Sequence, residues 1–324
     1  MSDALAIGVD AGGTKVAALV VDVREGVILD RRVVASPAED ADAFVRTIVG
    51  TATDILANHP GARVVGVGAA GIVDRKGVVC FSPNVAWRDF PLSERISEAI
   101  GLPTVVENDA NVAAWGEFRF GAGRGCTDML LVTVGTGIGG GIVVGGELLL
   151  GANGFAAEIG HIIVEPGGPE CGCGNRGCWE QVASGRAIDR LGRQAARQNP
   201  ASALLALAGA NPEQVTGTIV SGAAREGDPV AIQVLAEVGR RLGEGIAGLV
   251  NVLDPQIVVV GGGAMGAGAL LLEPARAACG RSVLGRGHRP EVLLVAASMG
   301  NDAGAVGAAD LAYRRAATGA EARQ

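Results

Sequence analysis

The chain contains one short pattern twice: an apolar strand, a glycine turn and a second apolar strand. The first copy runs from Leu5 to Val23 around Gly12-Gly13, and the second runs from Met129 to Val144 around Gly135-Thr136-Gly137. Such a repeat indicates two similar α/β halves, although unrelated glycine turns can resemble each other by chance. Because 324 residues is near the size at which one hydrophobic core divides, we expect two lobes.

Composition excludes several classes of protein. With 48% hydrophobic and 19% charged residues, the chain is not disordered. Its net charge of −7 argues against nucleic acid or an anionic membrane surface as a partner. Residues 129–146 carry no charge, but seven of them are glycine, which favours turn-linked strands over a membrane span. No basic segment precedes an apolar run at the N-terminus, so we expect no signal peptide and a cytoplasmic location.

Hydrophobic periodicity predicts the remaining elements. Further strands are expected at 27–34, 64–68, 104–107, 256–260 and 292–296, and helices at 39–58, 92–100, 109–118, 267–279 and 303–315. Helices should also dominate 186–252, whereas 151–185 should be irregular and 316–324 frayed.

Asp10-Ala11-Gly12-Gly13-Thr14-Lys15 has the composition of an anion-binding turn. Glycines let backbone N–H groups turn toward a phosphate, while Thr14 and Lys15 add a hydroxyl and a positive charge. Asp10 can hold Mg²⁺ directly or through water. The alternative is an ordinary hairpin turn, which the flanking Asp10 and Lys15 argue against.

Two other glycine runs are candidates for nucleotide binding. Gly135–Gly141 contains a Gly-x-Gly-x-x-Gly match, but Ile142–Val144 continues as a strand where a dinucleotide-binding fold needs a helix. We therefore interpret Thr136 and Gly137 as part of a second phosphate-facing hairpin. Gly261-Gly262-Gly263 follows another expected strand, where a plain strand-to-helix turn is an equal alternative.

Glu107-Asn108-Asp109 is expected where a strand meets a helix. A carboxylate there can accept a proton from a substrate hydroxyl, and Asn108 can hold a neighbouring hydroxyl. Either Asn108 or Asp109 can instead serve only as a helix N-cap, worth about 1 kcal/mol. The glycine turns elsewhere in the chain favour catalysis.

The most specific pattern is His161 followed by Cys171, Cys173 and Cys178. Three thiolates and one imidazole form a closed tetrahedral set for structural Zn²⁺, which leaves no open position for water. A redox thiol pair or free buried cysteines are the alternatives, and the absence of Cys-x-x-Cys argues against the first.

Glu158 and Glu180 flank the cysteine pattern. Carboxylates bind adjacent sugar hydroxyls, and a His161 that binds zinc through one nitrogen keeps the other for a hydroxyl. Solvated surface charge is the alternative for both glutamates.

Together these motifs resemble the ROK family of sugar kinases and repressors, and within it the bacterial glucokinases. The resemblance rests on five segments in this order: Asp10–Lys15, Glu107–Asp109, Gly135–Gly139, Glu158–His161 and Cys171–Glu180. It implies an α/β, two-lobed actin-like (ribonuclease H-like) ATPase fold with a zinc-stabilised loop. The implied lobes are residues 1–112 with a C-terminal helix at about 303–324, and residues 113–302 with the zinc loop.

By this resemblance Asp109 is the general base that takes the proton of the glucose 6-hydroxyl as the γ-phosphate of ATP arrives. The implied sugar-binding positions are Gly71, Asn84, Asn108, Asp109, Glu158, His161 and Glu180. The implied nucleotide-binding positions are Asp10, Gly12, Gly13, Thr14, Lys15, Thr136, Gly137, Gly261, Gly262 and Gly263. The implied zinc ligands are His161, Cys171, Cys173 and Cys178. One departure is Ala70, which stands where relatives often carry proline.

The implied ligands are therefore glucose, ATP with Mg²⁺ and a structural Zn²⁺, with a homodimer or homotetramer as the assembly. Another hexose, an N-acetylated hexosamine or polyphosphate as the donor remain alternatives. A sugar-sensing repressor is a further alternative, but it needs a DNA-binding module for which we expect no room before Asp10.

Overall fold

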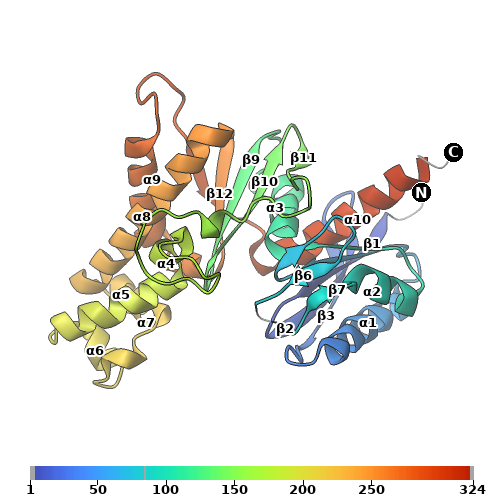
Figure 1. Ribbon diagram of the computed structural model, residues 1–324, viewed down its shortest axis with the longest axis horizontal. Coiled ribbons are helices and arrows are strands. Elements are labelled where there is room, and N and C mark those ends of the chain that lie inside the picture. Colours follow the sequence, from blue (N-terminus) through green and yellow to red (C-terminus); the bar gives the residue numbers. More distant parts are fainter. Residues whose placement is uncertain (1–3, 84, 322–324) are drawn as a thin grey trace. The chain divides into compact units, whose positions relative to one another are not determined.

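The structure is a computed structural model that describes residues 4–83 and 85–321. Contacts divide the chain into two compact units (Figure 1). The first comprises Met1–Leu131, Gly141–Ala157 and Ala297–Gln324, and the second comprises Val132–Gly140 and Glu158–Ala296. The predicted division into lobes 1–112 with about 303–324, and 113–302, stays a prediction.

The first sheet has the strand order β3-β2-β1-β4-β8. Its strands are β1 (Leu5–Ala11), β2 (Lys15–Asp22), β3 (Val27–Ala35), β4 (Val65–Ala69) and β8 (Thr104–Asn108). The first three form an antiparallel meander, and β4 pairs parallel with both β1 and β8. A small sheet that the sequence did not predict follows β4, with strands β5 (Ile72–Val73), β6 (Val79–Phe81) and β7 (Arg88–Phe90).

The second sheet repeats this plan in the order β11-β10-β9-β12-β13. Its strands are β9 (Met129–Val134), β10 (Ile138–Val144), β11 (Glu147–Leu148), β12 (Ile257–Gly261) and β13 (Leu293–Ala296). In each sheet three consecutive strands are neighbours, and two strands from later in the chain continue the sheet on the other side of the first of these three. The repeat predicted from the glycine turns is therefore present in the topology. The return strand starts at Ile138, however, and not at Ile142. Gly141 lies within this strand. The position requires glycine because a Cβ there would come 2.3 Å from Cβ of Ala114.

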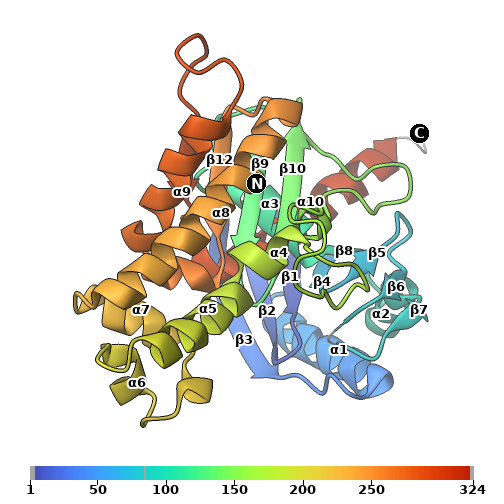
Figure 2. The ribbon, with the colours of Figure 1, turned by 60° about the vertical axis from the view of Figure 1, so that its left-hand side comes forward.

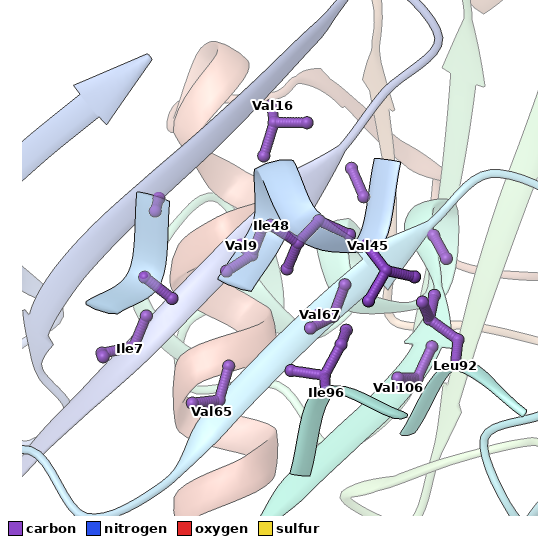
Figure 3. Packing of buried hydrophobic residues seen from close by; sticks show 14 of the residues in the cluster. Ile7, Val9, Val16, Val45, Ile48, Val65, Val67, Leu92, Ile96 and Val106 are labelled. Carbon is purple, nitrogen blue, oxygen red and sulfur yellow. The ribbon is translucent and has the colours of Figure 1, made fainter. Parts of the chain in front are cut away.

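The core of the first unit lies between one face of its sheet and two helices, α1 (Ala41–Asn58) and α2 (Leu92–Ile100). Alternate residues of a strand point to the same face, so Ile7 and Val9 reach this core together. They pack with Ile48 of α1 and Ile96 of α2, and all four side chains are fully buried (Figure 3).

The helices α3 (Asp109–Phe120) and α10 (Ala303–Glu321) complete the first unit. Glycines bring α10 into backbone contact with its neighbours: a Cβ on Gly66 of β4 would lie 1.9 Å from the Ala308 carbonyl oxygen, and one on Gly307 would lie 1.9 Å from that of Val112. The prediction that the chain frays from residue 316 is wrong as far as Glu321, because its alanines favour helix. Residues 322–324 lie outside the described residues.

The second unit is mainly helical. Its helices are α4 (Trp179–Ala183), α5 (Gly185–Gln198), α6 (Ala203–Leu207), α7 (Gly217–Arg225), α8 (Pro229–Leu253) and α9 (Ala269–Ser282). Short 3₁₀ turns occur at η1 (Ile159–His161), η2 (Pro212–Gln214) and η3 (Gly263–Ala267), and at η4 (Gly300–Asp302) in the first unit. The helices α8 and α9 lie side by side (Figures 1 and 2). Within the described ranges, no helix has the length and apolar character needed to cross a bilayer.

Candidate active site

The carboxyl ends of β1, β4 and β8 meet at one edge of the first sheet. Asp10 is in register with Gly68, and Gly68 is in register with Glu107. The turn after Asp10 and the helix that starts at Asp109 therefore leave the sheet at the same edge. In open α/β sheets ligands bind beyond this edge, so the first unit brings two of the predicted motifs together.

The turn between β1 and β2 presents polar groups to solvent. Its four residues are closed by a hydrogen bond of 3.1 Å from the Gly12 N–H to the Lys15 carbonyl, and Thr14 and Lys15 are exposed. Asp10 lies half-buried beside this turn, and burial raises its pKa more than Lys15 lowers it. Such a turn can offer N–H, hydroxyl and ammonium groups to an anion, with a carboxylate beside them for a cation.

Asn108 is the N-cap of α3, as one of the two interpretations predicted. Its Oδ1 accepts hydrogen bonds from the Ala110 and Asn111 N–H groups at 2.9 and 3.0 Å, and its Nδ2 donates to the Gly71 carbonyl at 2.9 Å. Asp109 is the first residue of α3, is exposed, and accepts from the Ala110 N–H at 2.8 Å. The helix N-terminus stabilises its negative charge.

Gly71 has a backbone conformation that only glycine adopts readily at this place. Its φ is 123°, and a Cβ there would lie 2.2 Å from the Phe81 carbonyl oxygen. The turn that carries Ala70 and Gly71 is thus fixed to the strand-to-helix junction through Asn108. Asn84, the other predicted sugar-binding residue of this segment, lies outside the described residues.

Within the second unit, two predicted nucleotide loops adjoin each other. Gly262 has a φ of 90°, and a Cβ there would lie 2.5 Å from the carbonyl oxygen of Val134, at the end of β9. The next residues, Gly135 to Gly137, close a tight turn through a hydrogen bond of 3.0 Å, and Thr136 is exposed at its tip. The 261–263 and 135–137 runs therefore form one glycine-rich surface.

The four predicted metal ligands lie together. Their ligand atoms are all within 4.8 Å of one another. Sγ of Cys171 is 3.6 Å from Nδ1 of His161, and Sγ of Cys173 is 3.6 Å from Sγ of Cys178. Bond lengths of about 2.3 Å for Zn–S and about 2.0 Å for Zn–N place ligand atoms of a tetrahedral site roughly 3.5–3.8 Å apart. The residues therefore fit structural zinc.

The thiols of this cluster differ in acidity. Burial raises the pKa of Cys171 to about 12. Burial acts in the same direction on Cys173, but hydrogen bonds from the Asn175 N–H and the neighbouring thiols lower its pKa to about 7. Metal binding requires thiolates, so loading the cluster has to release protons.

Glu158 and Glu180 lie beside the cluster, from opposite ends of the zinc loop. Glu180 Oε1 accepts from the Cys171 thiol at 3.1 Å, and a Cβ on Gly137 would lie 2.2 Å from Glu180 Oε2. Glu158 remains exposed, yet desolvation and the nearby Glu180 raise its pKa against the effect of His161. Since Nδ1 of His161 faces the sulfurs, its Nε2 points elsewhere. Three groups able to bind hydroxyls thus adjoin a predicted nucleotide turn.

Glu107, in the predicted strand-to-helix motif, and Glu117, which the sequence did not single out, are both buried with distant partners. Glu107 is 5% exposed and accepts from Arg315 Nη2 at 3.0 Å and from Asn111 Nδ2 at 3.2 Å. Glu117 is fully buried and holds the segment at Ser298. The hydrogen bond between Glu107 and Arg315 joins residues 208 positions apart, and that between Glu117 and Ser298 joins residues 181 positions apart. No local sequence pattern predicts either contact.

Comparison with known proteins identifies the family. The ROK family matches residues 6–315. A glucokinase of Streptomyces coelicolor is 47% identical over 311 residues, which are 95% of this chain and 97% of that protein. A ROK family glucokinase from Streptomyces griseus, solved in complex with glucose and AMPPNP, superposes with a TM-score of 0.86 at 48% identity, over 96% of this chain and 99% of that one. A ROK hexokinase from Thermus thermophilus gives a TM-score of 0.80 at 35% identity, over 97% and 99% of the two chains.

These matches span nearly the whole chain. The matched range, residues 6–315, contains the segments that form both sheets and the cysteine cluster of this protein. The fold is thus the actin-like α/β fold of the ROK sugar kinases, with the duplicated sheet order described above. The chain belongs to the ROK family.

Proposed function

We propose that this protein is an ATP-dependent glucokinase that transfers the γ-phosphate of ATP to the 6-hydroxyl of glucose. The observation that carries the proposal is the exposed carboxylate of Asp109 at the N-terminus of α3, on the same sheet edge as the Asp10–Lys15 turn. A relative 48% identical to this chain was solved with glucose and AMPPNP, which supports both ligands.

In the proposed reaction Asp109 accepts the proton of the attacking hydroxyl. Phosphoryl transfer depends mainly on positioning and charge neutralisation, so the protein needs little covalent chemistry. The Gly12 N–H closes the turn on the Lys15 carbonyl, and the Gly13 N–H, with Thr14 and Lys15, binds phosphate oxygens. Asp10 would hold the Mg²⁺ that accompanies ATP and neutralises its charge. The 135–137 and 261–263 runs supply further N–H groups to the nucleotide.

The sugar-binding residues of the proposal are Gly71, Asn84, Asn108, Glu158, His161 and Glu180. Glu158 and Glu180 accept hydrogen bonds from sugar hydroxyls, and His161 uses the nitrogen that faces away from the sulfurs. Zinc held by His161, Cys171, Cys173 and Cys178 would fix the loop that carries Glu180. Because four protein ligands saturate this site, its role is structural.

Substitution of Asp109 by asparagine tests the proposal. A general base contributes about 10²- to 10⁴-fold to rate, so kcat for glucose should fall by that factor in Asp109→Asn, while calorimetric glucose affinity is preserved. Asp54→Asn, which removes an exposed carboxylate of α1, should leave kcat unchanged. Near-normal turnover in folded Asp109→Asn protein would refute the role of the base.

A substrate panel tests the specificity of the proposal. Glucose with ATP should give the highest kcat/KM among glucose, mannose, fructose and N-acetylated hexosamines, each tried with ATP and with polyphosphate. A clear preference for another pair would assign a different kinase activity. We also propose a cytoplasmic homodimer or homotetramer, as the family resemblance implies, and light scattering of the purified protein tests the assembly.

A further inference from the structure

We propose that the first unit carries a binding site for a phosphate-bearing metabolite in a cavity between α3, α10 and the β10–β11 hairpin, and that this site regulates sugar binding. The cavity has a volume of about 580 Å³, within the range of small-molecule sites. The regulatory part rests on the proposed kinase function, whereas the binding part does not.

Four arginines from three distant segments converge on this cavity: Arg75 from the β5–β6 turn, Arg119 from α3, and Arg314 and Arg315 from α10. The protein as a whole has a net charge of −7, so such a concentration of guanidinium groups is unusual for this chain. Arginine binds phosphate oxygens through paired N–H groups of its planar fork. The lining thus suits a phosphate, whose oxygens can accept such paired hydrogen bonds.

Nearby carboxylates offset part of this charge and leave donors available. Asp310 is 1% exposed, and its Oδ2 accepts from Nε of Arg119 at 3.2 Å and from Nε of Arg314 at 2.8 Å. Both contacts use Nε, so this carboxylate leaves the terminal Nη groups of the two arginines to other partners. Glu147 lines the cavity, and Glu107 pairs with Arg315 at 3.0 Å, so both carboxylates reduce the net positive charge of the lining. The site is therefore weakly positive and rich in directed donors.

Apart from Thr318, the uncharged side chains of the lining are apolar or aromatic. Phe118 and Trp115 form an aromatic pair with ring centroids 5.4 Å apart, and Leu148 and Leu150 face the same cavity. A free phosphate would leave most of this volume unused. The fitting ligand is a phosphate monoester whose organic part covers the apolar wall.

Two of the four arginines also hold segments of the proposed sugar site. Arg315 Nη2 donates to Glu107, two residues before Asp109, at 3.0 Å. Arg75 Nε donates to the Gly151 carbonyl at 3.0 Å, in the loop that leads to Glu158. A ligand that orders these arginines through their other N–H groups would also order those segments. Glucose and the phosphate monoester should therefore bind with positive and reciprocal coupling.

The test uses phenyl phosphate as the probe, with inorganic phosphate and phenol as comparisons, in calorimetric titrations of the full chain without ATP. Phenyl phosphate should bind more tightly than inorganic phosphate, and phenol should not bind measurably. Arg314→Gln should weaken phenyl phosphate at least tenfold. Arg46→Gln removes one exposed positive charge of α1 and should bind the probe as the wild type does.

The coupling is measured by glucose titrations with and without saturating phenyl phosphate. Glucose affinity should rise severalfold in the wild type and should not change in Arg314→Gln. Because binding is measured without turnover, an inactive kinase that still binds the probe would overturn only the proposed function. If phenyl phosphate does not bind at millimolar concentration, or if Arg314→Gln binds it as tightly as the wild type does, the proposed binding site is wrong. The arginines would then only neutralise the ends of α3 and α10. An unchanged glucose affinity in the wild type would overturn the regulatory role.

Discussion

The carboxylate of Glu117 in α3 accepts a hydrogen bond of 2.8 Å from the backbone N–H of Met299, 182 residues further along the chain. It also accepts from the N–H groups of Ser298 at 3.0 Å and Ala122 at 2.8 Å. These donors belong to the segment that leads into α10 and to the loop that leaves α3. One fully buried side chain thus fixes two connections of the first unit.

Glu117→Gln should therefore destabilise the protein. The amide places an NH₂ group among N–H donors and removes the charge that strengthens these bonds, so we expect a loss of about 2–4 kcal/mol in the free energy of unfolding. Urea titration measures this loss. Glu98→Gln, on the exposed side of α2, is the matched control and should change stability by less than about 0.5 kcal/mol. Similar midpoints for both variants would contradict the role of Glu117.

Two helical glycines should respond in opposite ways to alanine. In α10 a Cβ on Gly307 would lie 1.9 Å from the Val112 carbonyl oxygen, so Gly307→Ala must separate α10 from α3 and should cost more than about 3 kcal/mol. In α7 a Cβ on Gly222 meets no described atom within 4 Å. Gly222→Ala should therefore stabilise the protein by about 0.5–1 kcal/mol through helix propensity. Thermal unfolding of the two variants measures both effects, and a Gly307→Ala protein as stable as the wild type would refute the contact between α10 and α3.

Asp228 should make stability depend on pH. It caps α8 and holds α6, because its carboxylate accepts from the N–H groups of Ala231 at 2.8 Å and Ala203 at 2.7 Å and from Ser202 Oγ. Burial alone would raise its pKa, but these hydrogen bonds together lower the pKa below the ordinary value of 3.8. The stabilisation is therefore present above about pH 4 and is lost as the pH falls through the folded-state pKa.

Asp228→Ala should accordingly lose about 1–2 kcal/mol at pH 7, the usual worth of an N-cap. The difference from the wild type should shrink as the pH approaches 3. Urea unfolding at both pH values measures it. A difference that is equal at the two pH values would show that the charge of Asp228 contributes nothing.

Local sequence patterns were sufficient for most of the fold and for several site segments. Hydrophobic periodicity predicted α2 at its observed bounds and β4, β8 and β12 to within a residue, because one side or both sides of each element have to be buried. The small sheet of β5 to β7 was missed, since its strands have only two or three residues and carry no periodicity. The early start of β10 was missed because Gly141 is selected by its contact with α3 and not by a turn.

The long-range partners of the site were beyond sequence reasoning. The spacing of His161, Cys171, Cys173 and Cys178 indicated one cluster because few donor sets suit zinc. By contrast, Arg315 looks like any surface arginine at a helix end, and only the packing of α10 brings it to Glu107. Interactions of this kind depend on tertiary structure alone.

Removal of the proposed zinc ion should lower stability and glucose affinity together. Zinc bound by the cluster would hold the loop from His161 to Cys178. Glu180 follows that loop, with its Oε1 3.1 Å from Cys171 Sγ. Without zinc the loop loses its cross-link, so the melting temperature should fall and the glucose affinity should weaken by at least tenfold. Chelator-treated protein and Cys178→Ser, compared by metal analysis, thermal unfolding and glucose titration, measure these effects. Cys126→Ser removes a thiol outside the cluster and should keep zinc, stability and glucose affinity. If protein shown to lack zinc keeps its full glucose affinity, the cysteine cluster does not contribute to the proposed sugar site.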